Sequence, residues 1–305
     1  MKPDELKDRL RGVQVVLITP MKEDLSVDLD GLAANVSTVL EFAVDGLVVS
    51  GTYGEFPTLT SDERVDMFRV VARAAGARVP VIACVAHSAT REAVSLAERA
   101  VEAGVDGVLV APPFLSETNP DEVVGHFRAV ANAVDVGVVI YNDPDLGVYL
   151  DVPMLTRIAD EVAEICGIKH GATDIRELDR LVDALGDRLA LICGSDTMAI
   201  PAHVLGLDGI TSSRTGPFPE LIPRIWKHLE DNDVAQARRL HEGWRAYRRF
   251  SSRMGEPATM KAAHELRGRP GGPVRPPLRP LGATEREELG QVVKQIVDFI
   301  AGLDS

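Results

Sequence analysis

The chain has 305 residues, of which 45% are hydrophobic and 26% are charged, as in a globular protein with a sizeable core. A formal net charge of −13 argues against a nucleic-acid partner, because phosphate binding needs a basic face. The N-terminus lacks the apolar stretch of a secretory signal, and no apolar run is long enough to span a bilayer. Cys84, Cys166 and Cys193 lie in apolar runs without the spacing of a metal site. We therefore expect a cytoplasmic protein with no membrane and no nucleic-acid partner.

Short β-branched runs alternate with longer amphipathic stretches over most of the chain. This alternation predicts parallel strands joined by crossover helices. Several runs are apolar throughout, which is typical of a sheet covered on both faces. The predicted strands are residues 13–18, 46–50, 79–85, 107–111, 137–141, 166–169, 189–193 and 209–211.

Capping signals support the predicted helices. Thr60 and Glu63 form the pattern of a capping box, and Thr90 is expected to cap the next helix. About eight strand–helix units favour a (β/α)8 TIM barrel, an α/β fold. A doubly wound open sheet is the alternative, but no GxGxxG follows the first strand.

The alternation of strand and helix patterns ends after residue 222. Residues 222–250 and 256–266 look helical, whereas residues 268–280 are largely Pro, Gly and Arg and cannot form regular structure. Thr284 and Glu287 are expected to cap a last helix. We predict that residues 1–222 form the barrel with the active site and residues 223–305 form a small C-terminal helical domain.

Lys169 is the strongest candidate for chemistry. It closes an apolar run, so its amine is expected in or beside a core. Burial penalises the charged form of a lysine, and a neutral amine attacks carbonyl groups. The alternative is a strand-end lysine whose amine simply reaches water.

Other polar residues follow the predicted strands, and in such a barrel the chemistry lies at these ends. Gly51 and Gly54 allow a tight turn whose N–H groups can hold a carboxylate, and the Thr52 hydroxyl can pass a proton. Tyr141 would project into the same mouth. An ordinary turn and a core tyrosine remain the alternatives. Tyr53 and Phe114 are expected to be pocket walls.

A metal site is a weaker hypothesis. His87 and His170 could form a metal pair with Glu55 or Asp196, but their spacing is not specific. We therefore expect no metal ion and no cofactor.

Three ordered motifs resemble the dihydrodipicolinate synthase / N-acetylneuraminate lyase family. They are GTYGEFPTLT at 51–60, IYNDP at 140–144 and GIKHGATD at 167–174; the KAA segment at Lys261 and GPVRPPL at 272–278 extend the likeness. The resemblance implies a (β/α)8 barrel with C-terminal helices, a homo-oligomer (dimer or tetramer) and a small-molecule 2-oxo acid substrate.

The resemblance also implies the roles of the site residues. Lys169 would attack the ketone of pyruvate or a related 2-oxo acid and form a Schiff base. Tyr141 would relay protons and Thr52 would link to it. The backbone N–H groups of Thr52 and Tyr53 would hold the substrate carboxylate.

Some positions depart from the dihydrodipicolinate synthase pattern. Leu146 stands where those enzymes carry an arginine that grips the second substrate. Phe114 stands where they carry a tyrosine that reaches in from a neighbouring subunit, and Tyr53 replaces a small hydroxyl residue. These departures count against lysine biosynthesis.

Other segments are similar to the 5-dehydro-4-deoxyglucarate dehydratases and other lyases of 2-oxo-3-deoxy acids, namely APPFL at 111–115 and GPVRPPL. Asp143, Asp196 and Ser213 could hydrogen-bond a hydroxylated tail. The leading hypothesis is a Schiff-base lyase that acts by aldol cleavage, condensation or dehydration. The alternatives are dihydrodipicolinate synthase itself, a barrel that binds 2-oxo acids without turnover, and a metal-dependent aldolase.

Overall fold

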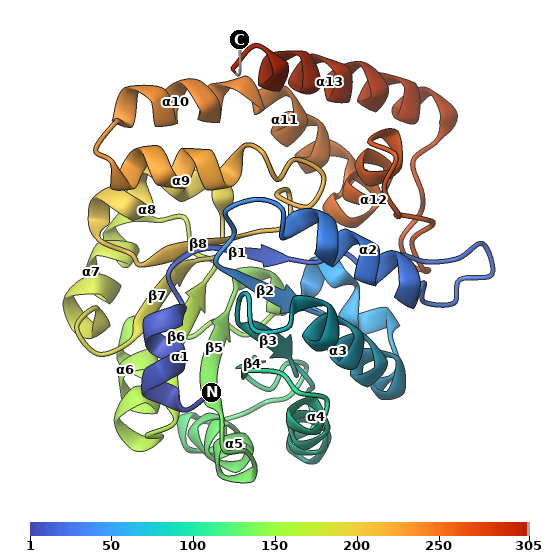
Figure 1. Ribbon diagram of the computed structural model, residues 1–305. Helices are drawn as coiled ribbons and strands as arrows, with labels where there is room; N and C mark the ends of the chain where they lie inside the picture. The colour runs from blue at the N-terminus through green and yellow to red at the C-terminus, as the bar shows by residue number, and fades with distance from the viewer. Residues whose placement is uncertain (304–305) are drawn as a thin grey trace.

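The computed structural model describes residues 1–303 and shows a closed barrel of eight parallel strands (Figure 1). The strands pair in chain order, and β8 closes the barrel by pairing with β1. Each predicted strand overlaps an observed one, so the predicted barrel is confirmed. The strands are β1 (Gly12–Val16), β2 (Gly46–Val49), β3 (Val81–Cys84), β4 (Gly107–Val110), β5 (Gly137–Asn142), β6 (Ile165–His170), β7 (Ala190–Cys193) and β8 (Gly209–Ser212).

A ring of helices covers the outside of the barrel, and every strand residue is buried. Most strand residues are apolar, as packing on both faces requires. The helices that connect successive strands are α2 (Leu29–Val39), α3 (Ser61–Ala75), α4 (Thr90–Glu102), α5 (Pro120–Ala133), α6 (Val152–Glu161), α7 (Ile175–Leu185) and α8 (Ala199–Leu205).

One of the predicted helix caps is confirmed and two are wrong. The capping box of α3 is confirmed, because the Thr60 hydroxyl accepts from Glu63 N–H and the Glu63 carboxylate accepts from Thr60 N–H. The prediction for Thr90 was wrong, since its hydroxyl bonds the His126 ring instead of capping α4. The prediction for α13 (Ala283–Ala301) was also wrong, because Glu285 accepts from Gly282 N–H there.

A short N-terminal helix, α1 (Pro3–Arg9), packs against β5 and β6, and the sequence analysis assigned no element to it. Its Leu6 is fully buried and belongs to the apolar cluster inside the barrel. Two strands begin with glycine at this contact. A Cβ on Gly107 or Gly137 would lie 2.3 or 2.8 Å from the Leu6 side chain. This packing closes the N-terminal end of the barrel and leaves the site to the other end.

The remaining helices gather on one side of the barrel (Figure 1). They are α9 (Ile222–Glu230), α10 (Val234–Gly243), α11 (Arg245–Met254), α12 (Glu256–Leu266) and α13. The residues 222–250 that look helical fall into α9, α10 and the start of α11. The break between α9 and α10 lies where Asn232 has a positive φ and Asp233 caps α10. The division into domains at residue 222 stays a prediction, since α9 also packs against β1 and α8.

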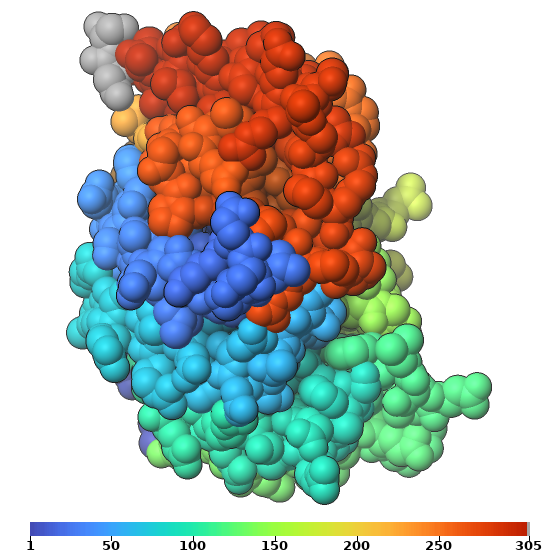
Figure 2. Space-filling view, turned by 90° about the vertical axis from the view of Figure 1, so that its right-hand side faces the viewer, coloured from blue at the N-terminus to red at the C-terminus, as the bar shows by residue number. Residues whose placement is uncertain are grey.

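The segment between α12 and α13 is irregular, as expected, but it is well packed. It lies against the β1–α2 connection, where the C-terminal residues meet the dark-blue segment in Figure 2. Met21 N–H donates to the Gly271 carbonyl, and the Asn35 amide donates to the Pro270 carbonyl. Gly272 has a φ of 73°, and a Cβ there would lie 1.9 Å from the Met21 carbonyl oxygen. No helix within residues 1–303 is both long and apolar enough to cross a membrane.

Leu6→Ala should lower the free energy of unfolding by about 2–5 kcal/mol, because it opens a cavity at the closed end of the barrel. Urea unfolding followed by circular dichroism measures this change. Val204→Ala is the matched control, since Val204 on α8 is 69% exposed and its loss should change stability little. Equal midpoints for the two variants would contradict the role given to α1.

Candidate active site

The pairing of β5 with β6 brings two of the predicted site residues together. Tyr141 lies directly opposite Lys169 in the parallel register, and Asn142 lies opposite His170. Since side chains alternate along a strand, Tyr141 and Lys169 point to the same face. Both line a cavity of about 160 Å³, a size that suits a small acid.

The amine of Lys169 is buried at the floor of this cavity, and the residue is 6% exposed. Its Nζ lies 3.9 Å from the centre of the Tyr141 ring and 3.1 Å from Oδ2 of Asp143. Burial alone would lower the pKa of this amine, but the acidic groups of Tyr141 and Asp143 outweigh it, so the pKa is raised. The resting side chain is therefore an ammonium beside a carboxylate.

The Tyr141 hydroxyl interacts with Lys169 and also with a second group. It lies 2.7 Å from the Thr52 hydroxyl, so these two side chains form the start of a proton path. Burial raises the pKa of Tyr141, and the nearby Lys169 only partly opposes this. Tyr141 therefore keeps its proton and can donate it.

Thr52 belongs to a glycine loop in which β2 runs into two short 3-10 turns, Thr52–Gly54 and Phe56–Thr58. The loop is tightly packed: a Cβ on Gly54 would lie 3.1 Å from the Leu17 carbonyl oxygen. The Thr19 hydroxyl donates to the Gly54 carbonyl at 2.6 Å. The first N–H groups of a turn have no partner inside it, so those of Thr52 and Tyr53 are available to a ligand.

A buried ion pair fixes the end of this loop. Glu55 has a φ of 59° and is 1% exposed, and its carboxylate lies 2.5 Å from Nζ of Lys261 on α12. Lys261 also donates to the Pro273 carbonyl, and Arg275 N–H donates to the Glu55 carboxylate. The glycine loop is thus tied to the C-terminal part of the chain.

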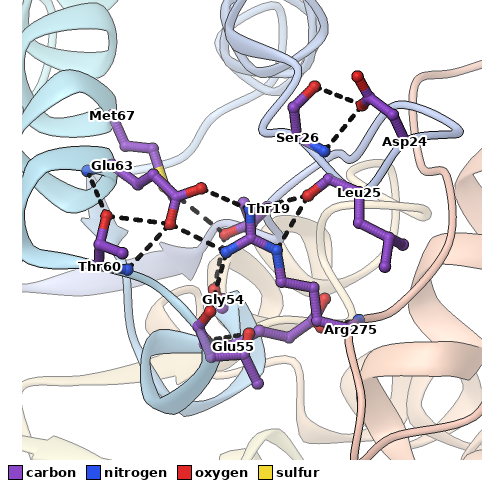
Figure 3. Close-up of polar contacts among 11 residues, drawn as sticks. Thr19, Asp24, Leu25, Ser26, Gly54, Glu55, Thr60, Glu63, Met67 and Arg275 are labelled. Atoms are coloured by element: carbon purple, nitrogen blue, oxygen red, sulfur yellow. Dashed lines mark hydrogen bonds and ion pairs between the residues drawn. The ribbon is translucent and has the colours of Figure 1, made fainter.

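Arg275 adds a second tie, and Figure 3 shows its contacts with Glu63 and Leu25. Its guanidinium pairs with Glu63 on α3 and donates to the carbonyls of Leu25 and Thr58. Hydrogen bonding to Arg275 is the main cause that lowers the pKa of Glu63 to about 2. One arginine therefore joins the β1–α2 connection, the glycine loop and α3.

The opposite wall of the cavity holds a second charged cluster. Arg214 follows β8 and pairs with Asp196 and with Glu256 of α12. Ser212 donates to Asp196 at 2.7 Å, and Ser251 donates to Glu256 at 3.0 Å. Both terminal nitrogens of Arg214 are therefore engaged with carboxylates.

Most of the predicted site residues meet at the cavity. It is lined by Gly51, Thr52, Tyr53, Tyr141, Lys169, Asp196 and Ser213, along with Asp143 and Arg214. Gly54 supports the loop from behind. Phe114 is not among the lining residues, and its ring packs edge-on against Phe56 at 6.2 Å.

Sequence reasoning missed three features of the site. Arg214 was given no role, although it lies only three residues after the predicted strand 209–211. Glu256 gave no signal, because it comes from a distant helix. The pairing of Asp143 with Lys169 was not foreseen, although Asp143 was already a candidate for binding the tail.

Two observations concern the synthase and the metal-dependent aldolase, which were alternatives in the sequence analysis. Leu146 packs against the apolar cluster inside the barrel. Within residues 1–303, no group of three or more His, Cys, Asp or Glu side chains is arranged to hold a metal ion.

Comparison with known proteins extends these findings. The family model described as "Dihydrodipicolinate synthetase family" matches residues 9–296. The chain is 31% identical to a 4-hydroxy-tetrahydrodipicolinate synthase of Methanopyrus kandleri over 94% of this chain and 97% of that protein. It is 35% identical to an uncharacterised DapA-like lyase of Halobacterium salinarum over 92% of both chains.

Its fold is similar to that of YagE, a prophage protein of the dihydrodipicolinic acid synthase family from E. coli K12, solved in complex with pyruvate. The TM-score is 0.88 at 27% identity, over 94% of this chain and 98% of that one.

Lys261→Met should lower the free energy of unfolding by about 3–5 kcal/mol, because it leaves the Glu55 carboxylate buried without its partner. Thermal and urea unfolding measure the loss. The double variant Glu55→Gln with Lys261→Met should recover part of it, since no buried charge then remains.

Lys294→Met is the matched control for this change, because Lys294 pairs with Asp298 on the exposed surface of α13. Its unfolding midpoint should stay close to that of the unaltered protein. If the two lysine variants were equally stable, the buried pair would not hold the loop.

Proposed function

The chain belongs to the dihydrodipicolinate synthetase family, and on this premise we propose that it cleaves or dehydrates a 2-oxo-3-deoxy sugar acid or a related 2-oxo acid. Membership makes it a lyase of the class that works through a lysine Schiff base. The observation that carries the proposal is the position of the Lys169 amine. It lies at the floor of a small polar cavity, beside the Tyr141–Thr52 pair.

The proposed chemistry begins when the Lys169 amine attacks the ketone and water leaves. The protonated imine draws electrons from the adjacent carbon, so a C–C or C–O bond further along the substrate can break. Tyr141 gives its phenolic proton to the departing oxygen or takes one back, and Thr52 extends this path. The N–H groups of Thr52 and Tyr53 hold the substrate carboxylate.

The polar lining of the outer cavity supports a hydroxylated tail. Thr173, Ser195 and Ser213 line it, whereas both carboxylate oxygens of Asp196 are engaged by Ser212 and Arg214. Hydroxyl groups of a sugar acid can exchange hydrogen bonds with the side-chain hydroxyls. The lining therefore favours a tail with several hydroxyl groups.

The second candidate is 4-hydroxy-tetrahydrodipicolinate synthase, which is the printed activity of several relatives. That reaction joins pyruvate to aspartate semialdehyde, whose carboxylate needs a cation. Leu146 supplies none, and Arg214 is already engaged with Asp196 and Glu256. We therefore rank this activity second.

A homo-oligomer, dimer or tetramer, stays a prediction. It is supported by Leu115 in the β4–α5 connection, which combines 96% exposure with a φ of 59°. A large apolar side chain held in this conformation at the surface suits contact with a second copy of the chain.

Intact mass measured after sodium borohydride treatment with pyruvate tests the Schiff base. We expect one adduct that maps to Lys169, and no adduct with Lys169→Ala. Turnover should fall by several orders of magnitude in this variant, because the nucleophile is lost. Normal turnover by Lys169→Ala would end the proposal. The absence of an adduct with any 2-oxo acid would also end it and would leave a barrel that binds without turnover.

Trapping with 2-oxo-3-deoxy sugar acids tests the reaction type. A trapped pyruvate means aldol cleavage, and a trapped acid that has lost one water means dehydration. Steady-state assays should show a higher kcat/KM with such acids than with pyruvate plus aspartate semialdehyde. The reverse ranking would make the synthase the correct assignment.

A further inference from the structure

Asp143 contacts the amine that carries the proposed chemistry. Its Oδ2 accepts a hydrogen bond from Nζ of Lys169 at 3.1 Å. The Tyr141 hydroxyl lies 2.7 Å from the Thr52 hydroxyl and also hydrogen-bonds the Lys169 amine, which lies over the face of the Tyr141 ring. Among residues 1–303, Asp143 supplies the carboxylate that accepts from this amine.

The local structure holds the Asp143 carboxylate in place. Its Oδ1 accepts from Asp145 N–H at 3.2 Å and so caps the 3-10 turn Pro144–Leu146. A Cβ on Gly171 would lie 2.7 Å from both Cγ and Oδ2 of Asp143. Gly171 donates its N–H to the Asn142 carbonyl at 2.8 Å, which fixes this close approach. Glycine at position 171 therefore leaves the space that the carboxylate occupies.

We propose that Asp143 is the catalytic acid–base group of Schiff-base formation on Lys169 and the counterion of the iminium that results. The inference rests on the proposed function, since it requires an imine at Lys169. It assigns to Asp143 the proton that first leaves the ammonium and later departs with the water, whereas Tyr141 carries the proton that moves from nitrogen to the new alkoxide.

Imine formation on Lys169 involves three proton transfers. Asp143 takes one proton from the ammonium, and the neutral amine attacks the ketone carbon. A second proton passes from nitrogen to the new alkoxide through Tyr141 and gives a carbinolamine. Asp143 then returns its proton to the hydroxyl, which leaves as water while the nitrogen lone pair forms the C=N bond. The products are the iminium, one water and the Asp143 carboxylate.

The electrostatics of the site make such a base necessary. The raised pKa of Lys169 keeps its amine protonated near neutral pH, so a proton must leave before the attack. The same carboxylate then lies beside the iminium and keeps it protonated, which the electron sink requires. The other titratable groups that interact with Asp143 are Tyr141, His170, Tyr53 and Tyr149.

Rapid-quench trapping by borohydride with pyruvate measures the rate of imine formation. Asp143→Asn keeps the acceptor for Asp145 N–H but loses the base, so the rate at pH 7 should fall about 100-fold. The matched control is Asp151→Asn, in the same β5–α6 connection, whose side chain accepts from Met154 N–H. Its rate should equal that of the unaltered protein.

The pH profile separates a proton-transfer role from a structural one. In the unaltered protein the proton moves within the ion pair, so imine formation should vary little between about pH 6 and 9. In Asp143→Asn the proton must leave to solvent, so the rate should rise about tenfold per pH unit until Lys169 itself is deprotonated. Formate should restore part of the rate to Asp143→Ala by entering the vacated space.

Gly171→Ala provides a second test that changes no charge. Its Cβ displaces the Asp143 carboxylate, so the rate of imine formation should fall as in Asp143→Asn. If Asp143→Asn formed the imine as fast as the unaltered protein, or faster, the inference would be overturned while the proposed function stood. If the unaltered protein formed no imine, the proposed function would fail first.

Discussion

An ammonium group buried at the end of a barrel strand requires a compensating negative charge nearby. In this protein the charge comes from the neighbouring strand, because the β5–β6 register places Tyr141 opposite Lys169 and Asp143 two residues further on. The glycine at position 171 then follows from sterics, since a side chain there would occupy the space of the carboxylate. The site is therefore organised around the Lys169 ammonium and the space that the Asp143 carboxylate occupies.

The glycine loop is held by a different part of the chain. Its own 3-10 turns are too short to be stable alone. Lys261 and Arg275, which lie more than 200 residues later, tie the loop to α12 and α3 through buried or partly buried ion pairs. The C-terminal residues therefore contribute to the site, although neither Lys261 nor Arg275 lines the cavity. These two side chains come from the KAA and GPVRPPL segments.

The sequence predicts the local features of this protein better than its long-range contacts. The strands were found because β-branched runs and helical periodicity are local signals, and Lys169, Tyr141 and Thr52 were found because they end strands. Glu256 escaped prediction because it reaches the site from α12, and α1 escaped because seven residues carry little periodicity. Phe114 was misplaced because the sequence does not show that Phe56 lies beside it. The positions of Glu256 and Phe114 depend on contacts between segments that are far apart in the sequence.

The ion pairs that Lys261 and Arg275 form also set an order of events while the chain is synthesised. The strands and Lys169 leave the ribosome first, but the partners of Glu55 and Glu63 come late in the chain. Until residue 275 of the 305 has been added, the buried carboxylate of Glu55 lacks part of its pairing and the glycine loop lacks its contacts with the C-terminal residues. A growing chain therefore carries Lys169 well before the glycine loop beside it is fixed.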